Sequence, residues 1–336
     1  MAQTMTAAQT AGHAGGQARA APGIRLMGWT ILTLMLAFLV NNVANIGYGT
    51  PTLAAALTGA AQGGAMVPIL IYGICLALGA AYVLGTGHVV LRTDSQRLHR
   101  FNLYLIRGCF WAVLLVGVAD ATIAQLRVEN LLVRFVSDDT ARALGRSAYV
   151  GPNVHMPLIA LGFFIALFTR TLGFIWLTLM IVIAQLMIVF LRFVFSYEQS
   201  LMGDLVRYWY AALFLFASAY TLFDEGHVRV DVFYAGFSRR TRGIVNACGS
   251  ILLGVTTCAV VLVLGLNGKT AIINAPVSNF EITQTGAVGM FVKYQMAAFL
   301  AVFAVTMIIQ FVSYFFDAVA DIRDEPGHQD HKPVTH

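Results

Sequence analysis

The sequence is poor in charge: only 11% of its 336 residues are Asp, Glu, Lys or Arg, whereas 58% are hydrophobic. Soluble domains carry about 25% charged residues. The mean hydropathy is +0.75, and most of the few charges lie between long apolar runs rather than inside them. This shortage of charge excludes a chain that folds as a water-soluble domain.

Cysteine, buried histidine and catalytic motifs are also scarce, and each shortage excludes a kind of chemistry. The cysteines lie in or beside apolar runs without a CxxC, which supports neither a disulfide framework nor a zinc site. The histidines fall in tails, loops or run edges, whereas a membrane haem needs axial histidines well inside helices. There is no P-loop, GxSxG or HExxH motif. We therefore predict no catalysis, no metal and no cofactor. The four cysteines are Cys75, Cys109, Cys248 and Cys258.

The net charge of +5 does not indicate a nucleic-acid partner. The basic residues are scattered over several loops, and no basic cluster is flanked by aromatic residues that could stack on bases. Lys and Arg instead favour the cytoplasmic side of a membrane protein. The uncharged segment Tyr48–Ala65 is predicted to lie outside, and the Arg-rich segment Asp224–Arg242 inside.

Long apolar runs dominate the sequence and predict membrane-spanning helices. About 20 apolar residues cross a hydrocarbon layer about 30 Å thick. The runs are neither short nor alternating, so they predict helices and not β-barrel strands. The fold prediction is an all-α, polytopic membrane helix bundle with seven or eight transmembrane helices, because an eighth run, Met156–Phe168, is short. The seven clear runs are Met27–Gly47, Ala65–Gly85, Leu103–Leu126, Leu172–Phe195, Tyr208–Phe223, Ile244–Leu266 and Gln295–Phe316.

Three other segments complete the predicted organisation. Residues 1–26 and 324–336 are polar and predict disordered tails. In residues 127–144, apolar side chains recur at helical spacing from Val128 to Val136. This pattern predicts an amphipathic helix that lies flat at the outer membrane face or packs on the bundle.

Few polar groups interrupt the apolar runs, and no clear run has a proline near its middle. Ion and substrate paths through membranes need such groups, often at broken helices. With no evident ion or substrate path and no catalytic motif, the chain is predicted by elimination to be a membrane scaffold. Ser250, Gly254 and Cys258 recur at every fourth position of one run and would let another helix approach closely. The sequence leaves open whether that helix belongs to this chain or to a partner.

The segment from Leu172 onward carries a more specific pattern. One helix ends in Leu191–Phe195, the acidic loop Ser196–Asp204 follows, and Asp204–Trp209 starts the next helix. That helix exits through Glu225–Val232, which reads EGHVRVDV, before the basic segment Ser238–Arg242. This pattern resembles the small-permease (Q-type) subunit of tripartite ATP-independent periplasmic (TRAP) transporters. The resemblance covers 172–323 and leaves 27–171 as an N-terminal membrane extension of three or four helices.

The resemblance implies a function. In this family the small subunit is a fixed scaffold that pairs with a large permease subunit, which carries the sodium and substrate sites. A periplasmic solute-binding protein delivers the substrate, typically an organic acid. The chain is thus expected to be a non-catalytic scaffold in a bacterial inner membrane, in contact with the lipid bilayer. Residues expected to meet the partner or to fix a loop are Arg192, Glu198, Arg207, His227, Arg229 and Asp231.

Two other classes of function stay open at this stage. One is a membrane anchor subunit of a redox enzyme that binds quinone or haem. The other is a stand-alone transporter, whose polar path would have to use the few polar residues of the runs. Those residues are Asn41, Asn42, Asn45, Asp120 and Gln185.

Overall fold

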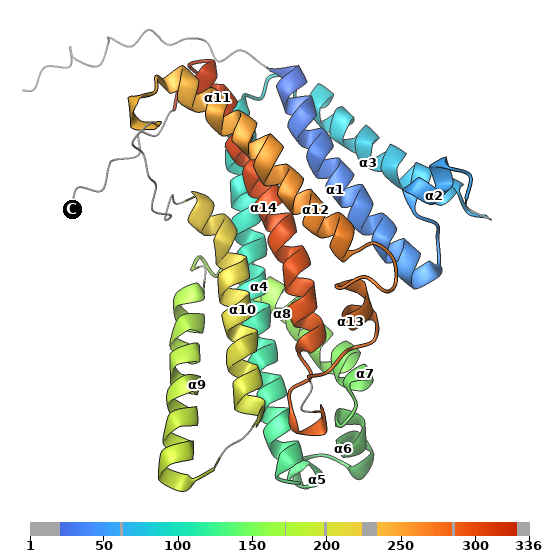
Figure 1. Cartoon of the computed structure of the whole chain (residues 1–336), viewed down its shortest axis with the longest axis vertical. Helices are drawn as coiled ribbons and strands as arrows, with labels where there is room; N and C mark the ends of the chain where they lie inside the picture. Colours follow the sequence, from blue (N-terminus) through green and yellow to red (C-terminus); the bar gives the residue numbers. More distant parts are fainter. Residues whose placement is uncertain are drawn as a thin grey trace, which may run out of the picture.

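A computed structural model describes residues 21–60, 63–171, 173–197, 200–223, 234–283 and 286–327 (Figure 1). Within these ranges all regular structure is helical, with no β-strand. The all-α prediction is therefore confirmed. The first helix begins at Pro22, earlier than the predicted Met27, because proline is well suited to the first turn of a helix.

The helices follow one another along the chain with mostly short connections. In order they are α1 (Pro22–Tyr48), α2 (Leu53–Leu57), α3 (Met66–Gly85), α4 (Leu91–Val128), α5 (Leu132–Phe135), α6 (Asp138–Leu144), α7 (Ser147–Val150), the π-helix η1 (Gly151–His155), α8 (Met156–Phe168), α9 (Phe174–Phe195), α10 (Ser200–Phe223), the 3-10 helix η2 (Tyr234–Gly236), α11 (Arg239–Gly249), the π-helix η3 (Ser250–Val255), α12 (Thr256–Gly265), α13 (Asn274–Ser278), the 3-10 helix η4 (Gly286–Val288) and α14 (Lys293–Ile322).

Seven helices in the described part of the chain are long and apolar enough to cross a membrane. The short run Met156–Phe168 is the end of one of them, because α7, η1 and α8 join into a single helix of 22 residues, Ser147–Phe168. The others are α1, α3, α4, α9, the joined α11–η3–α12 and α14.

The helix α10 is not among these seven, because Asp204, Arg207 and several tyrosines make it less apolar. It has 24 residues, which at about 1.5 Å per residue make it long enough to cross the hydrocarbon. It packs against α4, α9 and α14. Successive long helices alternate in direction, so that α1 begins and α14 ends at the same end of the molecule (Figure 1). This arrangement supports eight crossings.

The two longest helices form the centre of the molecule. α4 has 38 residues and α14 has 30, and they pack against each other. One apolar cluster surrounds them together with α9 and α10, and a second one together with α1 and α12. Two glycines permit close approaches. A Cβ atom at Gly162 of α8 would lie 2.5 Å from the backbone nitrogen of Ala112, and one at Gly117 of α4 would lie 2.2 Å from the indole nitrogen of Trp209.

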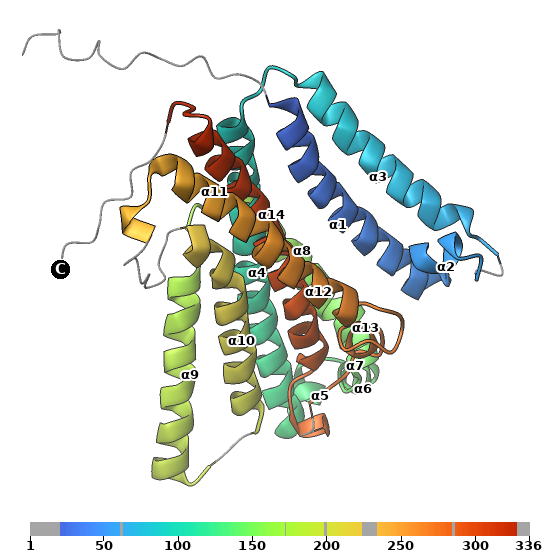
Figure 2. The ribbon, with the colours of Figure 1, turned by 45° about the horizontal axis from the view of Figure 1, so that its top comes forward.

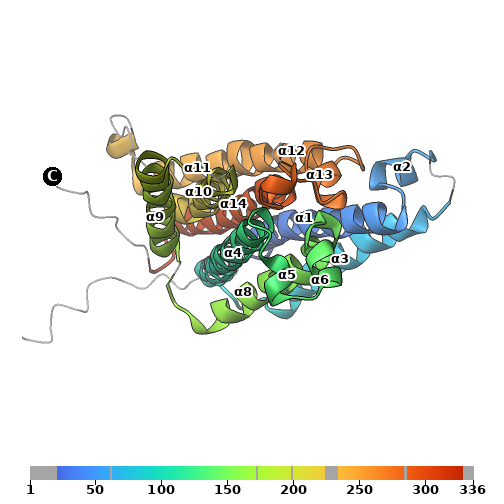
Figure 3. The ribbon, with the colours of Figure 1, turned by 90° about the horizontal axis from the view of Figure 1, so that it is seen from below.

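Peripheral helices lie at the two ends of the molecule. Seen from below, α9 lies at one end and α1, α2 and α3 at the other (Figure 3). In Figure 2 the α1–α3 pair projects to one side of the centre. α3 and α9 expose many large apolar side chains, for example Leu78 (64%) and Leu186 (62%). Lipid or another membrane subunit can cover such faces, whereas their exposure to water would cost free energy.

The segment 127–144 does not form the single amphipathic helix that its apolar spacing predicted. α4 ends at Val128, Asn130 adopts a left-handed conformation (φ 56°), and two short helices, α5 and α6, follow. Val136 is extended, and the Ser137 hydroxyl accepts a hydrogen bond from the Thr140 amide. Turn and capping interactions of Asn130 and Ser137 therefore override the apolar period.

Candidate functional site: polar networks between α4 and α14

Buried and partly buried polar side chains form three networks along the contact between α4 and α14. Because α4 belongs to the predicted extension and α14 to the C-terminal region, each network joins the two parts of the chain. The interior thus holds more polarity than the sequence indicated. Buried polar residues in the described part include Asp94, Ser95, Asn102, Asp120, His155, Asp204, Gln295, Thr306, Gln310 and Ser313.

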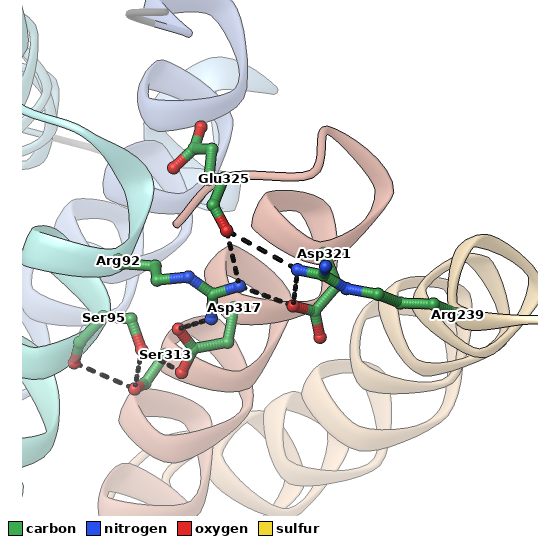
Figure 4. A network of polar contacts seen from close by, with 7 residues as sticks. All are labelled: Arg92, Ser95, Arg239, Ser313, Asp317, Asp321 and Glu325. Carbon is green, nitrogen blue, oxygen red and sulfur yellow. Dashed lines mark hydrogen bonds and ion pairs between the residues drawn. The ribbon is translucent and has the colours of Figure 1, made fainter. Parts of the chain in front are cut away.

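The first network, named here the Arg92 network, joins α4, α11 and α14 (Figure 4). The Arg92 guanidinium donates to Asp321 Oδ1 at 2.5 Å, and its other terminal nitrogen lies 3.7 Å from Asp317 Oδ1. Arg239 of α11 donates to the same Asp321 oxygen at 3.3 Å. Two arginines therefore face two aspartates, and the charges compensate each other where three helices meet.

Hydroxyl groups extend the Arg92 network toward the interior. Ser95 Oγ donates to Asp317 Oδ2 at 2.6 Å, and Ser313 Oγ donates to the backbone carbonyl of Ser95 at 3.0 Å. The two serine oxygens lie 2.9 Å apart. Small hydroxyl residues let α4 and α14 approach closely, and Ser95 donates to the partly exposed carboxylate of Asp317.

A neighbouring ion pair fixes α1 to the start of α4. Arg25 Nε donates to Asp94 Oδ2 at 2.7 Å, and both side chains are 0% exposed. Arg25 also donates to the carbonyl (2.6 Å) and the hydroxyl (2.8 Å) of Thr86. Asp94 accepts further bonds from Trp29 Nε1 at 3.0 Å and from the Tyr82 hydroxyl at 3.3 Å. Each charge is thus surrounded by partners, as burial requires.

The second network, the His99 network, lies deeper between α4 and α14. Asn102 Nδ2 donates to the Thr306 carbonyl at 3.0 Å and to Gln310 Oε1 at 3.3 Å. His99 Nδ1 lies 3.2 Å from the same Gln310 oxygen. The His99 ring also stacks on Phe223 of α10, with the ring centroids 3.4 Å apart. This network therefore ties α10 to the same contact.

The third network, the Asp120 network, joins α4, η1, α10 and α14 near the opposite end. Asp120 Oδ2 accepts from the Phe291 amide at 2.7 Å, and Asp120 Oδ1 lies 3.3 Å from His155 Nε2. His155 Nδ1 lies 2.9 Å from the Tyr294 hydroxyl. Asp120 and His155 are both 0% exposed.

The directions of the hydrogen bonds in the Asp120 network follow from its donors. Gln295 Nε2 donates to the Tyr294 hydroxyl at 3.0 Å, and the Tyr208 hydroxyl donates to Gln295 Oε1. Tyr294 is then able to donate to His155 Nδ1, which leaves the hydrogen of His155 on Nε2, facing Asp120. His155 is the last residue of the π-helix η1. Such a widened turn is a common way of redirecting a side chain in a helix.

The structure places the predicted partner-contact residues in different positions. Arg192 and Arg207 are exposed near the turn between α9 and α10, and Arg207 lies 3.9 Å from Asp204 Oδ1. Glu198, His227, Arg229 and Asp231 lie outside the described residues.

The small residues Ser250, Gly254 and Cys258 are all buried. A Cβ atom at Gly254 would lie 2.6 Å from the ring of Phe311. This glycine therefore contacts α14 of the same chain. Ser250 and Gly254 also belong to the π-helix η3 rather than to a regular α-helix.

Sequence reasoning missed the Asp120 network because it placed His155 at the edge of a short run. The complete helix Ser147–Phe168 is apolar enough to cross a membrane, and this is the signal that would have put His155 inside. Within the described ranges, no group of three or more His, Cys, Asp or Glu residues is arranged to hold a metal ion.

The fold and these networks define a multi-pass α-helical membrane protein whose buried polar groups join its own helices. Residues 178–320 match the family model described as tripartite ATP-independent periplasmic transporters, DctQ component. The match begins within α9, ends within α14 and covers somewhat under half of the chain. These helices are therefore similar to the small-permease component of TRAP transporters, and the resemblance seen from Leu172 onward is confirmed. No curated protein and no solved structure matches the chain.

Proposed function

We propose that the chain is a non-catalytic scaffold subunit of a sodium-coupled TRAP importer in a bacterial inner membrane. It pairs with a large permease subunit, and a periplasmic solute-binding protein delivers an organic acid or a related small solute to the complex. The observation that carries this proposal is the match of α9–α14 to the DctQ component.

The use of the buried polar groups supports a bracing role. Asp120 is held by the Phe291 amide and faces His155, while Asn102 is held by the Thr306 carbonyl. A transported ion needs ligands that are open to exchange with water. These side chains instead bind neighbouring helices, which favours a rigid scaffold over a conduction path.

The distribution of arginines supports an orientation with both described ends in the cytoplasm. Arg25, Arg92 and Arg97 lie at or near one end of the molecule, where α1 and α4 begin, and Arg239 lies where α11 begins. Arg323 follows the end of α14 at the same end. Clusters of this kind mark the cytoplasmic side. The α9–α10 turn then faces the periplasm.

The outer face of α9 is the surface that we propose for the large permease subunit. It belongs to the family-matched region, and its apolar side chains are strongly exposed, including Phe190 (57%) and Phe193 (80%). Among the long helices, α9 packs mainly on α10 and makes a smaller contact with α4. Arg192, Glu198 and Arg207 near the α9–α10 turn, and His227, Arg229 and Asp231 after α10, are proposed to contact the partner or to fix these loops.

Co-purification tests the proposal. The chain is co-expressed with a large TRAP permease subunit from the same genome, extracted in mild detergent and isolated through a tag on the chain. We expect a stable complex, and uptake only when the binding protein is also supplied. A homo-oligomer of this chain that transports solute alone in liposomes would refute the proposal.

A matched pair of variants tests the surface. Replacing Phe190 and Phe193 by alanine should weaken recovery of the large subunit. Replacing Leu70 and Leu78 of α3, which are exposed to similar degrees (54% and 64%), should leave it unchanged. Equal loss in both variants would show that general membrane packing, and not the α9 face, was disturbed.

An anchor role in a redox enzyme would need a histidine nitrogen available to haem iron. His155 faces Tyr294 with one ring nitrogen and Asp120 with the other. His99 contacts Gln310 and stacks on Phe223. Both rings are therefore used in packing, and the purified protein is expected to show no Soret absorption band.

A further inference from the structure

An apolar groove lies between α4 and the first turns of α9. It has a volume of about 220 Å³. An apolar cavity of about 150 Å³ holds benzene, so this groove accommodates a segment of a hydrocarbon chain. Trp176 on its wall is 57% exposed, so the groove opens at the outer surface of the helix bundle. The lining residues are Phe110, Trp111, Leu114, Gly173, Trp176, Leu177 and Met180.

Arg107 and the backbone of Arg170 lie next to residues that line this groove. Arg107 precedes Trp111 by one turn of α4, and its guanidinium donates to the carbonyls of Ala166 (3.4 Å) and Arg170 (3.2 Å) at the end of α8. Trp111 Nε1 donates to Thr169 Oγ1 at 3.1 Å in the same place. The end of α8 therefore holds both the Arg107 guanidinium and the indole of Trp111, next to the backbone of Arg170.

The charge of these arginines is not balanced within the described residues. No ion pair joins Arg107 or Arg170 to an Asp or Glu there. Arg107 Nε is buried without a hydrogen-bond partner, and Arg170 is exposed. The carbonyls at the end of α8 supply only partial negative charge. An anion that reaches both guanidinium groups would complete the site.

We propose that this groove binds one anionic phospholipid, with its phosphate at Arg107 and Arg170 and one acyl chain along Trp111, Leu114 and Trp176. Guanidinium groups bind phosphate through charge-assisted hydrogen bonds, and tryptophans favour the level of lipid headgroups. Lipid tails are as apolar as the groove itself, so the groove contributes to binding through its fit to the acyl chain. The preference for an anionic headgroup comes from the arginines. The bound lipid bridges α4, α8 and α9 and so joins the extension to the small-permease region.

Native mass spectrometry of the full-length, delipidated protein tests this site, with phosphatidylglycerol and phosphatidylethanolamine as probes. Wild-type protein should bind its first phosphatidylglycerol at least tenfold more tightly than phosphatidylethanolamine. Arg107→Gln and Arg170→Gln should each weaken phosphatidylglycerol binding about fivefold, as expected for a basic residue near an anionic membrane surface. Leu114→Trp fills the groove and should abolish the first binding event for both lipids.

The control is Arg146→Gln, which removes an exposed arginine just before the start of the same Ser147–Phe168 helix. It should leave the first binding event unchanged. Equal affinity for the two lipids, or equal loss in Arg146→Gln and Arg170→Gln, would overturn the proposal. Complete competition by inorganic phosphate would also overturn it, because the site would then bind a free anion rather than a lipid.

A second measurement keeps the test decisive if Arg107→Gln lowers stability. Arg170→Gln changes an exposed side chain and should leave the fold intact, so its effect on lipid binding tests whether the positive charge is needed. A phosphatidylglycerol that carries a photoreactive diazirine in its acyl chain should label the peptide containing Trp176 and Met180. Labelling of the exposed outer face of α3 to the same extent would overturn the assignment of the groove.

Discussion

The buried ion pair between Arg25 and Asp94 allows the contribution of one contact to be worked out in detail. Replacing Asp94 with alanine removes the acceptor of three side-chain groups, namely Arg25 Nε at 2.7 Å, Trp29 Nε1 at 3.0 Å and the Tyr82 hydroxyl at 3.3 Å. Arg25, which is 0% exposed, would be left as a buried cation. Removing one partner of a buried ion pair costs about 3–5 kcal/mol.

The loss should be visible as a lower melting temperature. Domains of 150–250 residues lose about 2–4 °C per kcal/mol, so Asp94→Ala should melt roughly 6–20 °C below the unmodified protein. Thermal unfolding in detergent, followed by tryptophan fluorescence, measures this shift. Replacing both partners, as Arg25→Met with Asp94→Leu, should restore most of the stability, because no charge then stays buried.

The double-mutant cycle contains the result that would refute this reasoning. If Asp94→Ala cost less than about 1 kcal/mol, the ion pair would contribute no more to stability than a solvated surface pair. Its burial would then not strengthen it. The cycle also needs Arg25→Met and Asp94→Leu measured singly. If the double variant lost as much stability as the sum of these two single variants, the two residues would not interact.

Three further predictions concern other helix contacts. Gly162→Val should destabilise the protein by about 1–3 kcal/mol or more, because its Cβ would lie 2.5 Å from the Ala112 backbone. The matched control is Gly47→Ala, where an added Cβ has no atom within 4 Å. Its melting temperature should be unchanged or slightly higher. His155→Leu should cost about 1–3 kcal/mol in the same melting assay, because Asp120 Oδ1 and the Tyr294 hydroxyl lose their contacts with the imidazole. His155→Gln should cost less, and equal costs would contradict a hydrogen-bonding role. Asn274→Ala should raise hydrogen exchange in residues 266–280, because Asn274 Nδ2 donates to Asn42 Oδ1 (2.9 Å) and to the carbonyls of Leu266 (3.1 Å) and Gly268 (2.9 Å). The control Asn42→Ala loses only the hydrogen bonds between the two amide side chains, so it should raise the exchange less. A larger effect of Asn42→Ala than of Asn274→Ala would contradict this account.

The sequence by itself determined the class of the protein and most of its spans. The thickness of the hydrocarbon layer sets the length of a spanning helix, and this requirement can be read from any stretch of about 20 residues without knowledge of its neighbours. The segment from Leu172 onward likewise contains its signature in consecutive residues, and the match over 178–320 covers nearly the same region.

The tertiary structure alone decided which residues lie together inside the molecule. Ser95 meets Ser313 across 218 positions of the chain, and Asp120 meets the Phe291 amide across 171. No periodicity within one helix encodes such pairs, because each partner lies on a helix that is distant in sequence. The same reason explains why the stripe through Gly254 could not be assigned until its contact with Phe311 was seen. A helix reveals from its own residues that it enters the membrane, but the neighbour against which it packs depends on how all the helices are arranged.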